Sequence, residues 1–350
     1  MKKFALVLFC IWFLTVCVFF SAGMLLAEDA PDMADFPALI REGTISRTFG
    51  SELEEWFAGN FAFHGSIADL FTGLRAAVLA EGNDQVIIGK DGFYFFADTV
   101  PDYIGSARMT DAEIDRTAEA LLSMQEDAEA EGAAFLFVCA PNKNTVYADK
   151  MPDRYRRSEE LSNMDRLFQA LDRLGGRYVD LRPVLTEHTG KNLVYHRRDT
   201  HWNGLGASLA VQEMLAAVQM ELLDLSGRGP LHTEEFQGDL SALLYQDKVE
   251  YDSDITYDFE GMFVFTSAYS TPMDIVITTR GGGEKKLLMF RDSFANACIP
   301  YLAASFAQTR LDRVTPYRTE EIEAYKPDVV IVEIAERNLP SLCEQITGES

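Results

Sequence analysis

Cysteine, positive charge and repeated sequence are all scarce in this chain. Five cysteines in 350 residues exclude a small disulfide-stabilised scaffold. The chain has 31 basic and 55 acidic residues, a net charge of −24, which argues against a nucleic-acid-binding protein because such proteins need a basic face. Neither repeats nor low-complexity tracts occur. The apolar content of 47% is sufficient for a folded core and excludes a mainly disordered chain.

Residues 4–27 form an uncharged apolar run that follows Lys2 and Lys3. At about 1.5 Å per residue, a helix of this length would span about 36 Å, which is enough to cross a bilayer. The two lysines predict a cytoplasmic N-terminus, so the rest of the chain would lie outside the cytoplasmic membrane. Ala27 suits a signal-peptide cleavage site, but Leu25 is too bulky for a good one. We therefore favour an uncleaved signal-anchor over residues 1–27.

Beyond this segment, residues 28–84 are expected to form a connector followed by a helical segment, with helix over 51–82. Residues 85–97 indicate a β-hairpin whose turn contains Asp91-Gly92. From about residue 110, apolar strands alternate with helices, which predicts a doubly wound, mainly parallel sheet flanked by helices. The stretch 225–284 interrupts this alternation. We interpret it as a β-rich insertion within a catalytic domain that covers residues 85–345.

Ser293 lies where the predicted strand 286–290 ends and a helix begins. In open α/β sheets, functional sites form at such carboxyl ends of strands. A serine there can act as a nucleophile, with the helix N-terminus favouring an oxyanion. The alternative is an ordinary N-cap, because serine and aspartate are favoured caps.

Asp199 and His201 lie on the loop that leads into the predicted helix 204–218. A serine nucleophile needs a base such as neutral histidine, and the histidine needs a carboxylate to fix its tautomer. Zinc binding by His196, Asp199 and His201 is an alternative. However, no helical metal motif is present, and the adjacent arginines oppose a cation, so we predict neither a metal nor a cofactor.

A third group of polar residues follows the predicted strand 133–139 and so occupies another carboxyl end of the sheet. Its candidates for substrate or oxyanion contacts are Asn142, Lys143 and Tyr147. Arg291 and Trp202, beside the serine and the histidine, complete the set. A simple loop with turn residues is the alternative for residues 140–147.

Several motifs together resemble the alginate O-acetyltransferase AlgJ/AlgX-like group, also called DHHW proteins, which are relatives of SGNH hydrolases. The most specific motifs are DTHWNGLGA (199–207) and RDSF (291–294). Similar signatures occur at 55–57, 88–92, 141–152, 238–240 and 332–338. Thr200 replaces the first histidine of the DHHW motif, and Arg291 replaces the glycine that esterases place before Asp-Ser.

The resemblance implies an SGNH-hydrolase-like fold and a triad in which Ser293 is the nucleophile, His201 the base and Asp199 the orienting acid. It implies an extracytoplasmic O-acetyltransferase that moves an acetyl group, through an acetyl-serine, onto hydroxyls of a polysaccharide. It also implies a multi-pass membrane O-acyltransferase as the partner that supplies acetyl groups. Alginate itself fits poorly with a charge of −24 unless the groove is locally basic, and residues that could make it so are Lys143, Lys150, Arg197, Arg198 and Arg291.

Two further functions fit the same residues. A carbohydrate acetylesterase would use the same triad with water as the final acceptor. A non-catalytic polysaccharide-binding or assembly protein would leave Ser293 unreactive, although the presence together of serine, histidine and aspartate argues against a decayed site.

Overall fold

The computed structural model describes residues 36–41, 44–60, 64–79, 81–221, 224–225 and 227–348. It divides into two compact units. The first comprises the described residues up to Leu79 together with Tyr245–Lys248, and the second comprises Ala80–Leu244 and the chain from Val249 onward. The apolar segment 1–27 that we expect to span the membrane lies outside the described residues. Within the described ranges, no helix is both long and apolar enough to cross a bilayer.

The first unit holds two short strands and two helices. Strand β1 (Ile40–Arg41) pairs antiparallel with β2 (Thr44–Ile45), and helices α2 (Phe49–Asn60) and α3 (His64–Leu79) follow. The helical structure predicted over 51–82 is present in the described residues as these two helices, and residues 61–63 between them are not described. Asp69 in α3 accepts hydrogen bonds from the backbone N–H groups of residues 246–248, which ties that segment to this unit.

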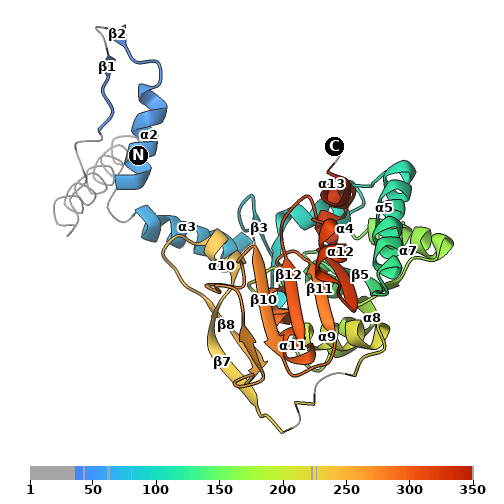
Figure 1. Ribbon diagram of the computed structural model, residues 1–350. Coiled ribbons are helices and arrows are strands. Elements are labelled where there is room, and N and C mark those ends of the chain that lie inside the picture. Colours follow the sequence, from blue (N-terminus) through green and yellow to red (C-terminus); the bar gives the residue numbers. More distant parts are fainter. Residues whose placement is uncertain are drawn as a thin grey trace, which may run out of the picture. The chain divides into compact units, whose positions relative to one another are not determined.

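The second unit is built on a seven-stranded sheet in the order β6–β5–β13–β11–β12–β10–β9 (Figure 1). The strands from β6 to β12 in this order run parallel, whereas β10 and β9 add an antiparallel edge. The sheet is thus mainly parallel, as predicted. Its strands are β5 (Ala134–Ala140), β6 (Tyr178–Val179), β9 (Phe263–Phe265), β10 (Val276–Gly281), β11 (Lys286–Phe290), β12 (Gln308–Asp312) and β13 (Val329–Ala335).

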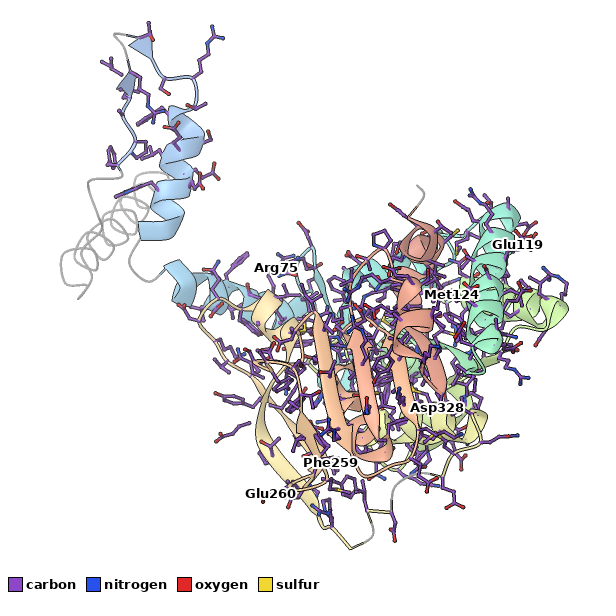
Figure 2. The ribbon with its side chains drawn as sticks, in the orientation of Figure 1. Arg75, Glu119, Met124, Phe259, Glu260 and Asp328 are labelled. Carbon is purple, nitrogen blue, oxygen red and sulfur yellow. The ribbon has the colours of Figure 1, made fainter. Side chains whose placement is uncertain are left out.

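Both faces of the sheet are buried, and alternate residues of each central strand enter opposite cores. Leu136 and Val138 of β5 pack on one face, while Phe135 and Phe137 pack on the other. The first core includes side chains of α9 (Gly204–Ala217) and α11 (Ile299–Ser305). The second includes those of α5 (Asp111–Ala130) and α7 (Asn163–Leu174), and Figure 2 shows Met124 on the inner side of α5 and Glu119 on its outer side. Helices on both faces make this a doubly wound fold.

Local sequence explains where the main helices start. Thr110 and Ser162 each form a capping box at the N-termini of α5 and α7, and the side chain of Asn203 caps α9. The helix predicted to begin after Ser293 starts instead as a 3₁₀ helix, η5 (Phe294–Cys298), before α11, which has proline in its first turn. The shorter helices are α4 (Val100–Tyr103), α6 (Lys143–Val146), α8 (Arg182–His188), α10 (Asp239–Leu244), α12 (Glu320–Tyr325) and α13 (Leu342–Thr347), with 3₁₀ helices η2 (Lys90–Gly92), η3 (Ala97–Thr99), η4 (Ala148–Lys150) and η6 (Glu336–Ser341).

Two β-hairpins lie outside the central sheet. The predicted hairpin at 85–97 is present as β3 (Val86–Ile88) and β4 (Tyr94–Phe96), and Asp91 adopts a positive φ in its turn. The second hairpin joins β7 (Pro230–Gln237) to β8 (Tyr251–Tyr257). We expected the whole stretch 225–284 to be an insertion, but its last two strands, β9 and β10, extend the central sheet because β10 pairs with β12.

Candidate active site

Ser293 lies at the carboxyl end of β11, a central parallel strand between β12 and β13. Asp292 fixes the turn, because its carboxylate accepts hydrogen bonds from the N–H of Phe294 at 2.9 Å and the N–H of Ala335 at 2.8 Å. It also accepts one from the side-chain amide of Asn338 at 3.0 Å. The Ser293 hydroxyl does not cap the helix that follows, so the simple N-cap interpretation does not hold for it.

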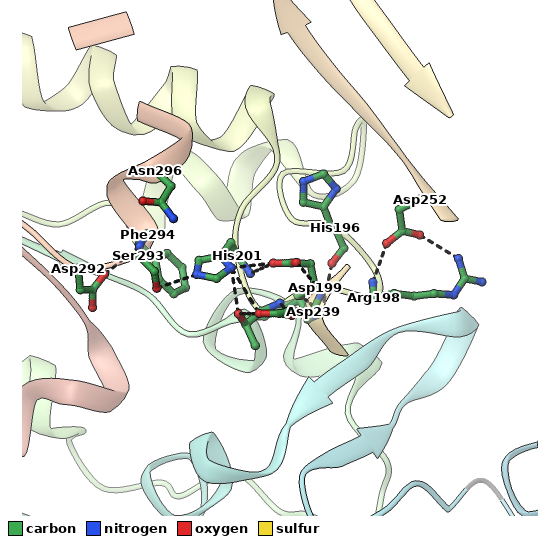
Figure 3. Close-up of polar contacts among 12 residues, drawn as sticks. His196, Arg198, Asp199, His201, Asp239, Asp252, Asp292, Ser293, Phe294 and Asn296 are labelled. Carbon is green, nitrogen blue, oxygen red and sulfur yellow. Dashed lines mark hydrogen bonds and ion pairs between the residues drawn. The ribbon is translucent and has the colours of Figure 1, made fainter. Parts of the chain in front are cut away.

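His201 connects this serine to Asp199 (Figure 3). Its Nε2 lies 2.8 Å from Ser293 Oγ, and its Nδ1 lies 2.7 Å from Asp199 Oδ1. The same Asp199 oxygen also accepts the backbone N–H of His201 at 2.8 Å, so the short loop fixes both the ring and its carboxylate partner. This arrangement selects the tautomer with a proton on Nδ1 and leaves Nε2 free to accept the serine proton.

Asp199 is almost fully buried, and its environment keeps it ionised. Burial by itself raises the pKa of this carboxyl. This effect is outweighed by the hydrogen bond to the His201 side chain, by the charge of His201, and by hydrogen bonds from the backbone N–H groups of Asp239 and His201, so the pKa lies well below its usual value. The N–H of Asp239 donates to Asp199 Oδ2 at 2.8 Å. Since both oxygens accept hydrogen bonds, Asp199 is a negative charge held in a fixed orientation beside the imidazole.

A second carboxylate supports the same loop. Asp239 accepts the Thr200 N–H at 2.7 Å and the Thr200 hydroxyl at 2.6 Å, and burial followed by the charge of Asp199 raises its pKa. The preceding Gly238 lies directly against the loop, since a Cβ there would be 2.1 Å from the carbonyl oxygen of Arg198. This contact explains the glycine in the 238–240 motif. Thr200, which replaces a histidine of the DHHW pattern, thus ties the loop to Asp239 at the start of α10.

The structure corrects our expectation for Lys143 and Tyr147, which do not line the site. Lys143 is buried, and its ammonium donates to the carbonyl oxygens of His196 at 3.2 Å, Arg197 at 2.9 Å and Asp199 at 2.6 Å. Burial lowers the pKa of Lys143 to about 7, against the raising effect of nearby acidic residues. Tyr147 lies in the core, where its hydroxyl accepts the Val194 N–H at 3.0 Å. Both residues position the loop that carries Asp199 and His201.

The other three candidates have different fates. Arg291 is buried and turned away, because its guanidinium donates to Asn296 Oδ1 at 2.7 Å and to the Pro272 carbonyl at 2.9 Å. Asn142 is also buried, and its side-chain amide has no hydrogen-bond partner among the described residues. Trp202 lines the cleft described next and packs edge-on against Phe294.

A cleft of about 620 Å³ opens beside Ser293 and His201. Aromatic side chains supply most of its lining, and Asp254, Thr256 and Asn296 are among its few polar residues outside the Ser293–His201–Asp199 chain. Such a volume and lining are typical of a site for a small molecule or a segment of a larger one. The aromatic and other apolar residues are Trp202, Phe236, Tyr257, Phe259, Phe263, Phe265, Tyr269, Pro272, Met273, Phe294, Ala297, Ile299, Pro300 and Tyr301.

Sequence analysis missed two residues of this region. Asn296 lies three residues after Ser293 and lines the cleft, with its Oδ1 held by Arg291. The Arg337 guanidinium lies 5.3 Å from the centre of the Phe294 ring and 5.7 Å from that of Phe96. No acidic side chain in the described ranges forms an ion pair with Arg337. The motif 332–338 and its place after a predicted strand were the available signals for Arg337.

The metal set considered from the sequence is not assembled. His196 Nε2 lies 3.9 Å from Asp254 and stacks on Phe236, away from the other two residues. A different group, Asp199, His201 and Asp239, brings its potential ligand atoms within 4.8 Å of one another. Those carboxylate oxygens already accept N–H and O–H groups, and a cation would have to displace the proton from His201 Nδ1. The hydrogen-bonded network is therefore the chemistry that this group favours.

Comparisons with known proteins agree with this picture. Residues 86–258 match the family model for the SGNH hydrolase-like domain of acetyltransferase AlgX. A probable alginate O-acetylase AlgJ of Pseudomonas syringae pv. tomato is 22% identical over 182 residues, which cover 50% of this chain and 45% of that protein. The chain thus matches less than half the length of this relative.

Solved structures show the same fold. A DHHW family protein from Eubacterium siraeum superposes with a TM-score of 0.59 at 17% identity, covering 76% of this chain and 96% of that one. Bacillus cereus PatB1 superposes with a TM-score of 0.52 at 15% identity, covering 73% and 97%. The α/β fold of the SGNH hydrolases is confirmed. Residues 86–258 are thus similar to the SGNH hydrolase-like domain of the AlgJ/AlgX-like group.

Proposed function

We propose that this protein is an O-acyltransferase that transfers an acetyl group through Ser293 onto a hydroxyl of a polysaccharide. The observation that carries the proposal is the continuous hydrogen-bonded chain from Asp199 through His201 to the Ser293 hydroxyl, with distances of 2.7 and 2.8 Å, at the end of a large cleft. The names of its relatives, an alginate O-acetylase and an acetyltransferase family, support acetyl as the group transferred.

The reaction proceeds in two half-reactions. Ser293 Oγ attacks the acetyl carbonyl carbon while its proton passes to His201 Nε2, and the donor's leaving oxygen departs with that proton. The acetyl-serine is then attacked by a sugar hydroxyl, whose proton again passes to Nε2 before returning to Ser293 Oγ. Asp199 stabilises the imidazolium in both steps because its carboxylate is ionised and already bound to Nδ1.

Arg337 is our candidate for stabilising the oxyanion, together with the backbone N–H of Ser293. Its guanidinium packs on the ring of Phe294, the residue after the nucleophile. The segment that carries it is tied to the serine turn, since Asp292 accepts both the Ala335 N–H and the Asn338 amide. A cation without an acidic partner in the described ranges is available to a developing negative charge.

The sequence supports placing this reaction outside the cytoplasmic membrane. The apolar segment 4–27 behind two lysines would anchor the catalytic unit there. A multi-pass membrane O-acyltransferase would then supply acetyl groups from the cytoplasm. Co-purification of the full-length chain with such a partner, and its loss when residues 1–27 are deleted, would test this arrangement.

The direct test is detection of the acetyl-enzyme. Residues 28–350 would be mixed with 4-nitrophenyl acetate, and acetylation of Ser293 measured by mass spectrometry next to Ser293→Ala and His201→Ala. We expect a burst of nitrophenol and acetyl on Ser293 in the wild type alone. Acetyl passing to sugar faster than to water would support a transferase, whereas rapid hydrolysis unaffected by any sugar would make the protein an esterase. If the folded wild type behaved like Ser293→Ala, the serine mechanism would be wrong.

The role of Arg337 has its own test. Arg337→Gln should slow the burst by about 100-fold or more, the usual effect of losing one oxyanion donor, with little change in KM. Arg337→Lys keeps the charge and should recover part of the rate. A burst of wild-type rate in Arg337→Gln would exclude the assignment.

A further inference from the structure

The cleft beside Ser293 is far larger than an acetyl group requires. Its volume of about 620 Å³ lies in the range of sites that enclose a whole small ligand, so most of it must hold a different reactant. If acetyl transfer proceeds through Ser293, that reactant is the acceptor, because its hydroxyl must approach the acetyl-serine. This identity of the second reactant therefore rests on the proposed function.

Five of the aromatic residues that line the cleft, Phe236, Phe259, Phe263, Phe265 and Tyr269, are called the aromatic platform here. Phe263 and Phe265 come from β9, whose side chains alternate between faces, so the residue between them, Val264, points away and is 60% exposed. Tyr269 stacks on Phe265 with ring centres 3.8 Å apart. Phe259, labelled in Figure 2, packs edge-on against Tyr301, another lining residue. The platform is thus built from several segments that hold its rings in place.

Charge in the cleft has one sign. Among the described residues, no lysine or arginine lines it, while Asp199 and Asp254 do. The nearby guanidinium groups of Arg291 and Arg313 are bound to backbone carbonyls, Arg291 to Pro272 and Arg313 to Met273. The Arg337 guanidinium packs on Phe294 and is not part of the lining.

The other basic residues that could have made the groove positive are also engaged elsewhere. Lys143 binds three carbonyl oxygens, Lys150 pairs with Asp91 at 2.8 Å, and Arg198 pairs with Asp252 at 2.9 Å. Arg197 is exposed and packs over Phe93. A polyuronate would therefore bring carboxylates against aromatic rings and two aspartates, with no lysine or arginine among the described lining residues to compensate them. Both desolvation and repulsion make this unfavourable.

We propose that the acceptor is an uncharged glycan whose sugar rings lie on this aromatic platform, and that polyuronates such as alginate are excluded. Flat apolar faces of neutral sugars match aromatic rings, and the polar groups of Thr256, Asn296 and Asp254 lie among those rings to receive hydroxyls. A neutral acceptor also agrees with the net charge of −24, since it is not repelled by the protein.

The test compares acceptors that differ only in charge. Acetyl-Ser293 would be formed with 4-nitrophenyl acetate and its decay followed with neutral tetrasaccharides, with an oligouronate of the same length, and with that oligouronate after reduction of its carboxyls. With the neutral tetrasaccharides and the reduced oligouronate, we expect acetyl-Ser293 to decay at least tenfold faster than by hydrolysis alone, and the sugar to become acetylated. With the unreduced oligouronate, we expect acetyl-Ser293 to decay only at the rate of hydrolysis. Equal or faster transfer to the oligouronate would overturn the proposal, as would transfer to long-chain alcohols alone.

A matched pair of variants locates the binding surface. Phe263→Ala should raise the acceptor concentration for half-maximal transfer by about 3- to 10-fold, whereas Val264→Ala, on the other face of the same strand, should leave it unchanged. Thr256→Lys places a cation at an exposed position of the lining and should let the oligouronate react. Equal effects of the two alanine variants would refute the platform.

Binding to Ser293→Ala separates this inference from the proposed reaction. Calorimetry with the same sugars requires no acetyl-enzyme, so absence of the burst together with binding of neutral sugars would reject the acyl transfer and keep the glycan site. If no neutral sugar binds Ser293→Ala and none accelerates the decay of acetyl-Ser293, the glycan site is rejected, whatever the nitrophenol burst shows.

Discussion

Two buried carboxylates near the carboxyl end of the sheet, Asp199 and Glu336, have pKa values shifted in opposite directions. Both accept two or more hydrogen bonds: Glu336 Oε2 accepts the Asn142 N–H at 2.8 Å and the Thr145 hydroxyl at 2.6 Å. Burial, followed by the charge of Asp102, raises the pKa of Glu336 to about 7. The pKa of Asp199 lies well below its usual value because burial is outweighed by His201 and two N–H groups.

The difference shows that burial alone does not decide the state of a carboxylate. Asp199 is bound to His201, which becomes a cation in the proposed reaction, so that reaction requires the negative charge of Asp199. Glu336 has an acidic neighbour, and the pKa of Asp102 is itself raised to about 6, first by burial. The two buried groups therefore differ in charge, since Asp199 stays ionised whereas Glu336 can be neutral.

The largest expected effect comes from removing the charge of Asp199. Asp199→Asn should slow acetylation of Ser293 on the order of 10³- to 10⁴-fold, because the imidazole loses its tautomer control and its counter-charge. Asp239→Asn, which changes a carboxylate that binds the same loop but has no short bond to the ring, is the control and should cost less than tenfold. Burst kinetics with 4-nitrophenyl acetate measure both, and similar losses in the two variants would show that the loop as a whole, rather than Asp199, controls the rate.

Lys143→Met tests how the Asp199 loop is held. The variant leaves three carbonyl oxygens without their ammonium donor and should lower the free energy of unfolding by about 2 kcal/mol. It should also slow the burst, since the backbone of Asp199 loses its support. Chemical denaturation measures the first effect, and a stability equal to the wild type would contradict the assigned contacts. Lys150→Met, which removes an exposed ion pair, is the control and should stay within about 0.5 kcal/mol.

Glu336→Gln tests the other carboxylate through pH. The folded-state pKa of about 7 is above the ordinary value of 4.5, so the wild type is stabilised below pH 4.5 and loses that contribution as the pH rises through 7. Relative to Glu336→Gln, whose side chain does not titrate, the wild type should lose about 2 kcal/mol of unfolding free energy between pH 5 and pH 8. Parallel pH profiles of the two proteins would show that Glu336 does not titrate in this range.

The smallest effect is expected at Thr200. Thr200→Val removes the 2.6 Å hydrogen bond to Asp239 and should lower the unfolding free energy by about 1 kcal/mol, with the burst rate within about fivefold of the wild type. Thr200→Ser keeps the hydroxyl and should match the wild type. If Thr200→Val lost much of the burst rate and Thr200→Ser did not, the Thr200 hydroxyl would act directly on His201 in addition to supporting the loop.

The sequence predicted much of this site because its signals are local. Strand 286–290 with Ser293 after it, and the loop with Asp199 and His201 before a capped helix, are each read from a few neighbouring residues. The helix caps at Thr110 and Asn203 were likewise predictable from side chains that satisfy free N–H groups. The roles of Lys143, Tyr147 and Arg291 were not, because side-chain direction depends on segments distant in the chain.

The sequence by itself determined the alternation of strands and helices, since apolar periodicity and caps act over one or two turns. It also determined which residues are candidates for nucleophile, base and acid, because these roles depend on the type of side chain. Only the tertiary structure decided that β9 and β10 extend the sheet, that the lysines and arginines near the site bind carbonyls and acids, and that aromatic rings line the cleft. Those outcomes depend on long-range packing, because the partner of each charged side chain comes from a segment that is distant in the sequence and close only in the fold.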